Sequence, residues 1–511
     1  MREHGVIVKK CRGCLRVALL YPSLYEAAVA SLAYQLLYYM LNSLDWVAAE
    51  RFILPSLGDL SEPLRSLETG SRLDSFDAII APVSYELDLV YLIHALAASG
   101  IEPRAPRRSK PWVIVGGPVP SMNPAPSLRV ADVVVVGEAE PTIPRLLEAL
   151  VEESLDSLSG GNGFLTHPVV EGGGRARRVY VSSLDEAPHP VLEFRVPGSG
   201  EPWGEAYMVE VSRGCRWMCR FCMEAFFTLP WRVRSYARVR GLIEEGVEAN
   251  RVRRVAFYSL SFFDHPAADR LLEYVAGEGL EASIGSLRAD TLNEDRLALL
   301  KMVGQRTLTI APETFSERLS CLLGKRIGYS LVEGLVEEAV RLGLKPKLYL
   351  MTGVPGESLE DTRRDAELAA RLVRVSRGVL RVTLNPLVPK PWTPLQYARF
   401  IGEEEYEARV RLYKRLLGGR VEALSYRWAY AQAVIARGGF DTGDALVKVA
   451  SETTRLGRVL RSLRGTSGDK AAREGLEPGE TLPWVELVDP GYPVAALVKS
   501  LESGLACLGR R

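Results

Sequence analysis

Residues 206–222 read "AYMVEVSRGCRWMCRFC", a short apolar strand pattern followed at once by three cysteines. Cys215, Cys219 and Cys222 have the spacing C-x3-C-x2-C within a single loop. Thiolates suit iron–sulfur clusters, and a complete [4Fe–4S] cluster takes four protein ligands. This loop supplies three. We therefore expect a cluster with one iron left open for an external ligand.

A structural zinc site, or a loop without metal, is the alternative interpretation of the three cysteines. Structural zinc is bound by four Cys or His ligands. The chain has no His between His189 and His265, and no Cys between Cys222 and Cys321. A fourth ligand close by in the sequence is lacking, so the cluster is favoured.

Strand and helix patterns alternate on the carboxyl side of about residue 205. Helical patterns such as 330–344 separate six apolar strand patterns. The strands are expected at 206–212, 254–260, 281–287, 306–312, 347–353 and 380–386. Six βα units predict a partial or full barrel of parallel strands, with chemistry at the carboxyl ends of the strands. The cysteine loop follows the first of these strands.

Residues 15–150 alternate in the same way, with strand patterns that are apolar throughout. These strands are expected at 15–22, 46–54, 76–84, 111–118 and 131–140. Such strands predict a doubly wound, flavodoxin-like parallel sheet with helices on both faces. The apolar run 27–44 carries Gln35 and Asn42 and is shorter than the roughly 20 apolar residues of a membrane span, so we expect one buried helix there.

The pattern divides the chain into four parts. An α/β domain is expected at 1–154 and a linker rich in Gly and Pro at 155–203. The barrel is expected at 204–400 and a mainly helical C-terminal region at 401–511.

Charge and cysteine content narrow the class of protein. The chain has 64 Lys and Arg against 63 Asp and Glu, which gives no electrostatic argument for a nucleic-acid or membrane partner. Seven unevenly spaced cysteines do not form a disulfide framework, so a reducing, cytoplasmic location is expected. Cys11 and Cys14 are interpreted as solvent-near thiols or half of an intermolecular metal site, and Cys321 and Cys507 as ordinary thiols.

The cysteine spacing, with the aromatic Phe221 before the last cysteine, resembles the signature of the radical S-adenosylmethionine (SAM) superfamily. Later segments resemble it in the order of the barrel strands: SLS (259–261), SLR (286–288), APE-x-x-S-x-R (311–318), GVPG (353–356) and VPKP-x-TP (388–394). The chain is most similar to an uncharacterised subgroup of the branch with an N-terminal cobalamin-binding-like domain. The resemblance covers nearly the whole chain.

This resemblance implies a radical SAM enzyme. In the superfamily, SAM chelates the open iron, and a ferredoxin- or flavodoxin-type donor supplies the electron that cleaves SAM to a 5′-deoxyadenosyl radical. Methyl transfer to an unactivated carbon is expected if cobalamin binds, and the substrate is not revealed. Two alternatives stay open: a cobalamin-independent enzyme such as a methylthiotransferase-like RNA modifier, and a non-enzymatic iron–sulfur or zinc binding module.

The resemblance also implies a set of cofactor-binding residues in the barrel. They are Phe221, Ser259, Ser261, Arg288, Glu313, Ser316, Arg318, Gly353 and Pro355. Glu313 would bind the ribose of SAM, Arg318 or Arg288 its carboxylate, and the backbone near Gly353 and Pro355 its adenine. For each of these a salt bridge or a plain strand-to-helix turn is the alternative.

Two places depart from the patterns of the wider superfamily. Many members hold the SAM amine with a Gly-Gly-Glu run after the second strand, where this chain has SLS (259–261), so the groups that hold the amine stay open. Cobalamin folds often carry D-x-H-x-x-G after the first strand, where this chain has "YPSLYEAAV" (21–29) without His. Cobalamin-dependent members often lack that His.

Ser84, Gly116 and Gly117 occupy the positions where cobalamin-binding domains contact the nucleotide tail. Adjacent glycines at a strand end allow a close backbone approach. Cobalamin binding by the first domain is therefore expected. A degenerate domain that binds substrate or nothing, with the glycines in a packing turn, is the alternative.

Overall fold

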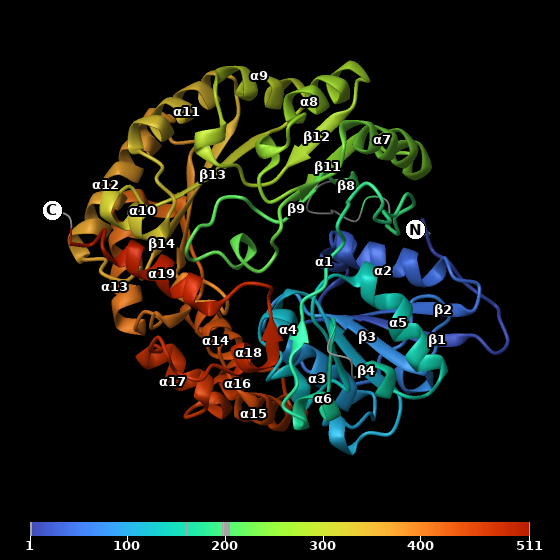
Figure 1. The fold of residues 1–511 in the computed structure, drawn as a ribbon. Coiled ribbons are helices and arrows are strands. Elements are labelled where there is room, and N and C mark those ends of the chain that lie inside the picture. Colours follow the sequence, from blue (N-terminus) through green and yellow to red (C-terminus); the bar gives the residue numbers. More distant parts are fainter. Residues whose placement is uncertain (1–2, 159–161, 197, 199–204, 510–511) are drawn as a thin grey trace. The chain divides into compact units, whose positions relative to one another are not determined.

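The computed structural model describes residues 3–158, 162–196, 198 and 205–509 (Figure 1). The chain forms two compact units. The first comprises 1–182, 186–202 and 430–493, and the second comprises 183–185, 203–429 and 494–511. Residues 159–161, 197 and 199–203 of the predicted linker lie outside the described residues.

The first unit is built on a six-stranded sheet in the order β2-β1-β3-β4-β5-β6. Its strands are β1 (Leu15–Tyr21), β2 (Val47–Ile53), β3 (Ala78–Pro82), β4 (Trp112–Gly116), β5 (Val133–Val135) and β6 (Phe164–Thr166). The first five pair in parallel and β6 is antiparallel to β5. The order 2-1-3-4-5 is that of flavodoxin-like sheets, so the predicted fold class is confirmed.

Helices cover both faces of this sheet, as Figure 1 shows for α2 and α5 on one face and α3 on the other. The helices are α1 (Tyr25–Val29), α2 (Leu32–Asn42), α3 (Asp88–Ala98), α4 (Pro118–Met122), α5 (Ala139–Val151) and α6 (His167–Glu171). Val17 and Leu19 of β1 form one buried core with Tyr34 of α2 and Leu146 of α5. No described helix is both long and apolar enough to cross a membrane.

The apolar run 27–44 forms two helices instead of the single helix predicted. Helix α1 ends at Val29, and Ser31 caps α2 by accepting a hydrogen bond from the Tyr34 amide. A serine at an N-cap satisfies an amide that a new helix leaves unpaired, which explains the break.

Part of the C-terminal region packs into the first unit. Helices α14 (Tyr426–Ala436) and α15 (Phe440–Ala450) are followed by α16 (Leu456–Leu463), α17 (Ser467–Glu474), α18 (Pro483–Leu487) and β17 (Val488–Asp489). Asn123 donates to the carbonyl of Gly438 at 2.8 Å, and the His94 ring bonds to the carbonyl of Ala450 at 2.9 Å. β17 pairs in parallel with β7 (Ala176–Arg177). The segment 155–203, predicted as a linker, thus contributes β6 and β7 to this unit.

The second unit is a partial barrel of parallel strands. The strands are β8 (Tyr207–Glu210), β11 (Arg254–Tyr258), β12 (Glu281–Ile284), β13 (Thr307–Glu313), β14 (Lys345–Thr352), β15 (Arg381–Pro386) and β16 (Val421–Ala423). They form the sheets β12-β11-β8 and β13-β14-β15-β16, which a parallel bridge between Leu287 and Ile310 links. The six predicted strands are confirmed, and β16 is a seventh that the sequence did not indicate.

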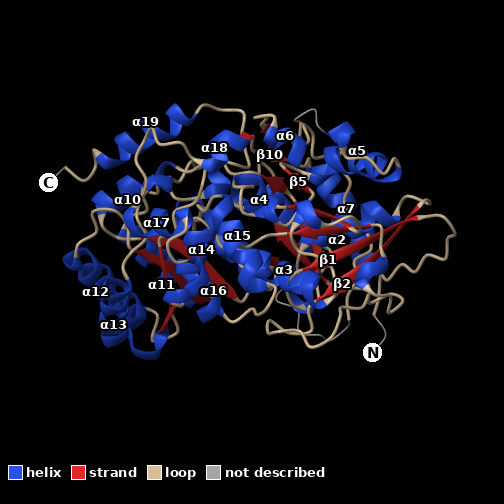
Figure 2. Ribbon diagram, turned by 90° about the horizontal axis from the view of Figure 1, so that it is seen from below, coloured by secondary structure: helices blue, strands red, loops and turns tan. Residues whose placement is uncertain are grey.

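Helices form the outer arc of the barrel, with the strands on its inner side (Figures 1 and 2). They are α7 (Tyr236–Asn250), α8 (Ala268–Gly277), α9 (Glu294–Met302), α10 (Glu317–Leu323), α11 (Tyr329–Arg341), α12 (Leu359–Val375) and α13 (Glu403–Leu417). The last helix, α19 (Val494–Leu505), packs against α10.

Four of the seven cysteines form disulfides, which corrects the prediction of ordinary thiols. Cys11 pairs with Cys14, and Cys321 pairs with Cys507. The second pair is separated by 186 residues and meets because α19 returns to α10, which spacing alone does not reveal. From sequence alone, two cysteines with two residues between them, such as Cys11 and Cys14, fit half of a metal site as well as a disulfide.

Candidate functional site

The cysteine loop leaves the carboxyl end of β8 and is closed at its base by a short ribbon. Strand β9 (Ser212–Arg213) precedes the cysteines, and β10 (Arg232–Val233) follows them and pairs antiparallel with β9. Gly214, the turn residue before Cys215, has φ +84°, and a Cβ there would lie 2.8 Å from the Thr228 carbonyl oxygen. Only glycine fits this entry to the loop.

Cys215, Cys219 and Cys222 remain thiols. Cys219 is buried and the other two are partly buried. Across the described part of the chain, no three Cys, His, Asp or Glu side chains converge on a point where one metal ion could bind. A [4Fe–4S] cluster has a different requirement, because each cysteine ligates a different iron. Three thiols distributed around one short loop fit that donor set.

A guanidinium lies against the middle cysteine. Arg288 Nη1 is 3.4 Å from Cys219 Sγ. Two hydrogen bonds to the Asp290 carboxylate, at 3.0 and 2.7 Å, fix the guanidinium, which also stacks at 3.7 Å on the Trp217 ring. The Trp217 indole N–H donates to Asp264. Arg288 is thus held where its charge acts on the cysteine loop.

Burial and charge act on the thiols in opposite directions. Burial raises the pKa of Cys219, while the nearby Lys325 and Arg288 cations lower it. Burial raises the pKa of Cys222 to about 12. Coordination to a metal deprotonates a thiol outright, so these values describe the protein before iron binds. The cations favour the thiolate form that iron needs.

Glu313, at the end of β13, is held in an unusual backbone conformation. Its φ is +69°, and the pairing of β13 with β14 shifts register between Ile310 and Glu313. Lys325 Nζ donates to its carboxylate at 2.8 Å, and both side chains are about 90% buried. Left-handed conformations of residues other than Gly are uncommon and cluster at functional sites.

The SLS segment carries a buried hydroxyl without a partner among the described residues. Ser259 Oγ bonds to Ser212 Oγ at 2.7 Å and accepts from the Ser261 amide at 3.2 Å. Ser261 Oγ is buried and makes no hydrogen bond within the structure described. Buried hydroxyls are normally satisfied, so a ligand group is a fitting partner for Ser261.

Ser316 and Arg318 bind protein groups. Both bind Asp361, with Ser316 Oγ at 3.1 Å, and Arg318 Nη1 also donates to the Gly356 carbonyl at 3.0 Å. They therefore join the loops that follow β13 and β14. Of the two arginines predicted as partners of the SAM carboxylate, Arg288 is the one beside the cysteine loop.

The GVPG turn after β14 is organised by Glu357. Gly353 has φ +79°, and its amide donates to Glu357 Oε2 at 2.6 Å, while the Val354 amide donates at 3.2 Å. Glu357 also pairs with Arg409 at 2.7 Å. An adenine bound at Gly353 and Pro355, as predicted, would therefore use carbonyl groups and not these two amides.

In the first unit, Ser84, Gly116 and Gly117 lie together at the carboxyl ends of the neighbouring strands β3 and β4. The Ser84 amide donates to Asp88 at 3.0 Å. Gly117 has φ +103°, and a Cβ there would lie 2.7 Å from the Val83 carbonyl oxygen. The close contact with Val83 thus explains the glycine at position 117 without a bound ligand.

Sequence reasoning missed several residues of the barrel site. They are Trp217, Arg220, Asp264, Asp290, Lys325 and Glu357. Asp290 and Glu357 lie close in sequence to the SLR (286–288) and GVPG (353–356) motifs, and this position is a weak signal that they belong to the site. Trp217 and Arg220 lie within the cysteine loop itself, but the sequence does not show that they bind Asp264 and the end of α10. Lys325 meets Glu313 only through the fold. Phe221 is half-buried within the cysteine loop.

Comparison with known proteins agrees with this geometry. Residues 209–369 match the family described as the radical SAM superfamily, and residues 33–166 match the family described as the N-terminal part of radical SAM proteins. An uncharacterized protein of Methanocaldococcus jannaschii is 30% identical over 83% of this chain and 88% of its own length. An uncharacterized methyltransferase of Pyrococcus horikoshii is 25% identical over 61% of this chain and 68% of its own.

A solved structure shares the fold. It is the radical SAM methyltransferase TsrM from Kitasatospora setae, with cobalamin and a [4Fe–4S] cluster bound. The match has a TM-score of 0.57 at 15% identity and covers 88% of this chain and 99% of TsrM. Members of the matched superfamily use a [4Fe–4S] cluster and SAM and need a reductant. From its sequence matches, its fold and its cysteine loop, the chain belongs to the radical SAM superfamily of enzymes.

Proposed function

We propose that this protein is a cobalamin-dependent radical SAM methyltransferase that acts on an unactivated carbon. The observation that carries the proposal is the three-thiol loop beside Arg288, in the same chain as a flavodoxin-like sheet. The relative from Pyrococcus horikoshii named as a methyltransferase, and the fold shared with a cobalamin-containing methyltransferase, support it. A bound cluster, SAM and cobalamin would supply the electron transfer and the methyl group.

The thiols of Cys215, Cys219 and Cys222 would each ligate one iron and leave one iron open. Arg288 carries the charge to meet the carboxylate of SAM, because it is fixed beside Cys219. Ser261 Oγ has an unused hydrogen bond for a polar group of SAM.

The remaining predicted residues have two kinds of role in this proposal. Glu313 would accept hydrogen bonds from the ribose, and the backbone at Gly353 and Pro355 would meet the adenine. Ser316 and Arg318 are positioning residues, because they hold the loops after β13 and β14 together through Asp361.

Cobalamin would bind at the carboxyl edge of the first sheet, where Ser84, Gly116 and Gly117 lie. Ligands of doubly wound sheets bind outside the carboxyl ends of the strands. The loop at 21–29 contains no His, so cobalt would have no histidine ligand from that loop.

Equilibrium dialysis with hydroxocobalamin tests the cobalamin part of the proposal. We expect the anaerobically reconstituted protein to retain about one cobalamin per chain. Ser84→Arg, which crowds the carboxyl edge, should reduce retention at least tenfold. Ser43→Arg, at an exposed position before β2 on the amino edge, should leave it unchanged.

A different result would favour a cobalamin-independent radical SAM enzyme, such as a methylthiotransferase-like RNA modifier. That result is a protein that takes up iron and binds SAM but retains no cobalamin. It would overturn the methyltransferase proposal and leave the superfamily assignment intact.

A further inference from the structure

The residue after Cys219 holds the end of a neighbouring helix. The Arg220 amide donates to the Leu323 carbonyl at 2.9 Å, and Arg220 Nη1 donates to the carbonyls of Cys321 at 2.9 Å and Leu322 at 3.1 Å. These are carbonyls of the last turn of α10, where a helix has few amides of its own to offer, and the Cys321 carbonyl also accepts from the Gly324 amide at 3.1 Å. Arg220 therefore joins the cysteine loop to the carboxyl end of α10.

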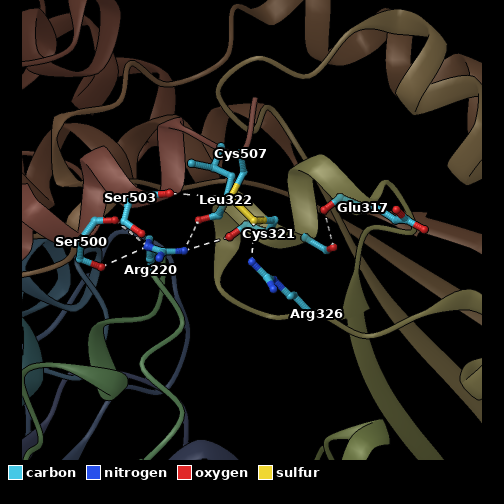
Figure 3. Close-up of a disulfide and its surroundings, with 9 residues drawn as sticks. Arg220, Glu317, Cys321, Leu322, Arg326, Ser500, Ser503 and Cys507 are labelled. Atoms are coloured by element: carbon cyan, nitrogen blue, oxygen red, sulfur yellow. Dashed lines mark hydrogen bonds between the residues drawn. A yellow bond between two sulfur atoms is a disulfide. The ribbon is translucent and has the colours of Figure 1, made fainter. Parts of the chain in front are cut away.

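The same guanidinium is bound from its other side by α19. Arg220 Nε donates to the Ser500 carbonyl at 2.7 Å and lies 3.1 Å from Ser500 Oγ (Figure 3). Helix α19 comes so close that a Cβ at Gly504 would lie 3.1 Å from Arg220 Cδ and from the Leu322 carbonyl oxygen. One side chain of the cysteine loop thus lies between two helices.

A disulfide ties these two helices to each other. Cys321 belongs to α10, and Cys507 lies two residues beyond the end of α19 (Figure 3). Arg326 Nη2 lies 3.0 Å from Cys321 Sγ. Helix α19 and Cys507 lie outside residues 209–369, the segment that matches the radical SAM superfamily.

We propose that Arg220, helix α19 and the Cys321–Cys507 disulfide form a clasp that holds residues 215–222 in their cluster-binding conformation. The inference rests on the proposed role of Cys215, Cys219 and Cys222 as cluster ligands. Arg220 is a positioning residue in this account, since it acts on the ligands through the backbone of the loop.

The clasp closes by thiol–disulfide exchange. The thiols of Cys321 and Cys507 react with the disulfide of a low-molecular-weight thiol: one S–S bond forms in the protein, one breaks in the reagent, and two reagent thiols leave with the two protons. The protein thiols are oxidised and the reagent is reduced by two electrons. The positive charge of Arg326 beside Cys321 Sγ favours attack by this sulfur when the disulfide forms. It also favours departure of the same sulfur when the disulfide is reduced. Excess thiol reverses the reaction.

Hydrogen exchange of the full-length protein without iron tests the clasp directly. We expect Arg220→Ala, and Cys507→Ser to a smaller extent, to speed amide exchange at least tenfold in residues 215–223 and 494–505. Cys14→Ser, which removes the other disulfide, should leave both segments at the wild-type rate. Unchanged exchange of 215–223 in both Arg220→Ala and Cys507→Ser would overturn the proposal.

Two further measurements separate loss of the clasp from loss of the fold and from failure of the proposed function. Helix α12 should exchange at the wild-type rate in every variant, which shows that the fold is intact. If α12 exchanges faster in Arg220→Ala, the milder Arg220→Lys takes its place, because it keeps the charge and removes the branched set of donors. After reconstitution, cluster absorbance in air should decay several times faster in Cys507→Ser than in Cys14→Ser. Equal decay would contradict the clasp. A wild-type protein that takes up no iron would contradict the proposed function, and the exchange experiment without iron would still decide the clasp.

Discussion

Charge at the middle cysteine is the main electrostatic feature of the site. Arg288 Nη1 contacts Cys219 Sγ at 3.4 Å, and its second contact, to Asp290, prevents it from turning away. Hydrogen bonds to cluster sulfurs and nearby charge tune the reduction potential of iron–sulfur clusters. A fixed cation favours the reduced state, which carries one more negative charge.

Arg288→Gln should lower the midpoint potential of the reconstituted cluster. A shift of about 60 mV corresponds to a tenfold change for a one-electron couple, and we expect a change of that order. A redox titration followed by electron paramagnetic resonance measures it. Arg296→Gln removes an equal charge from an ion pair with Asp269, which joins α9 to α8, and should leave the potential unchanged. Equal potentials in the two variants would contradict the role given to Arg288.

Single residues could be predicted where the chemistry is local in sequence. The three thiols follow from their spacing, and all three remain unpaired thiols in the fold. The partners of Arg318 and Cys321 could not be predicted, because Asp361 and Cys507 lie far along the chain and meet them only through packing. Lys325 lies only 12 residues from its partner Glu313, but the pairing depends on the turn between the end of β13 and α10, which periodicity does not reveal.

The turn between β14 and α12 depends on one buried carboxylate. Glu357 accepts hydrogen bonds from two amides of the turn and pairs with Arg409, and both charged side chains are less than 5% exposed. Removing one partner of a buried ion pair costs about 3–5 kcal/mol. Arg409 keeps a second, partly exposed partner in Glu405 at 2.6 Å, which places the expected cost at the low end of that range.

Glu357→Gln should therefore lower the free energy of unfolding by about 3 kcal/mol, measured by urea denaturation. Glu360→Gln is the matched control, because Glu360 pairs with Arg363 on the surface. Exposed pairs of that kind contribute little to stability, because water and salt screen them. Similar losses in the two variants would contradict the structural role of Glu357.

Asp88, at the amino end of α3, gives the first unit a pH dependence. Burial raises its pKa from 3.8 to about 6, against the opposing effect of the Tyr85 and Ser84 amides. Because the pKa is higher in the folded state, the stabilisation by protonated Asp88 is complete below the unfolded pKa and is lost as the pH rises through 6.

Between pH 4 and pH 7 the wild type should thus lose roughly 2.4 kcal/mol of stability relative to Asp88→Asn. Urea denaturation of both proteins across this range measures the difference between their free energies of unfolding. The other titrating groups contribute equally to both proteins, so their effects cancel in this difference. A difference that does not vary with pH would show that the pKa of Asp88 is the same in the folded and unfolded protein.

Long, regular elements could be predicted from periodicity, and short ones could not. The five parallel strands of the first sheet and six strands of the barrel follow from apolar runs between helical patterns. β16 has three residues, too few for a pattern, and it forms because β15 offers it an edge. The break between α1 and α2 depends on one side-chain hydrogen bond of Ser31.

At the scale of the whole molecule, the chain crosses between its two units more than once. Residues 430–493 pack with the first unit, and 494–511 return to the second. The helical character of this region could be predicted from its sequence. Its division between two cores could not, because helix periodicity shows that a face is buried and not against which partner.

The Cys321–Cys507 disulfide closes a loop of 186 residues and should stabilise the second unit by constraining its unfolded chain. Loop-closure entropy gives about 5 kcal/mol for this pair and about 2 kcal/mol for a three-residue separation such as Cys11–Cys14. Guanidinium unfolding should show Cys507→Ser to be less stable than Cys14→Ser by about 3 kcal/mol. Equal stability would contradict a disulfide at Cys321 in the folded protein.

We predict that the loop of Cys215, Cys219 and Cys222 holds a [4Fe–4S] cluster with one iron open to SAM. Electron paramagnetic resonance of the anaerobically reconstituted and reduced protein tests it most directly. We expect a [4Fe–4S] signal that changes on addition of SAM and that is absent in Cys219→Ser. A signal that SAM does not change, or one that persists in Cys219→Ser, would contradict it.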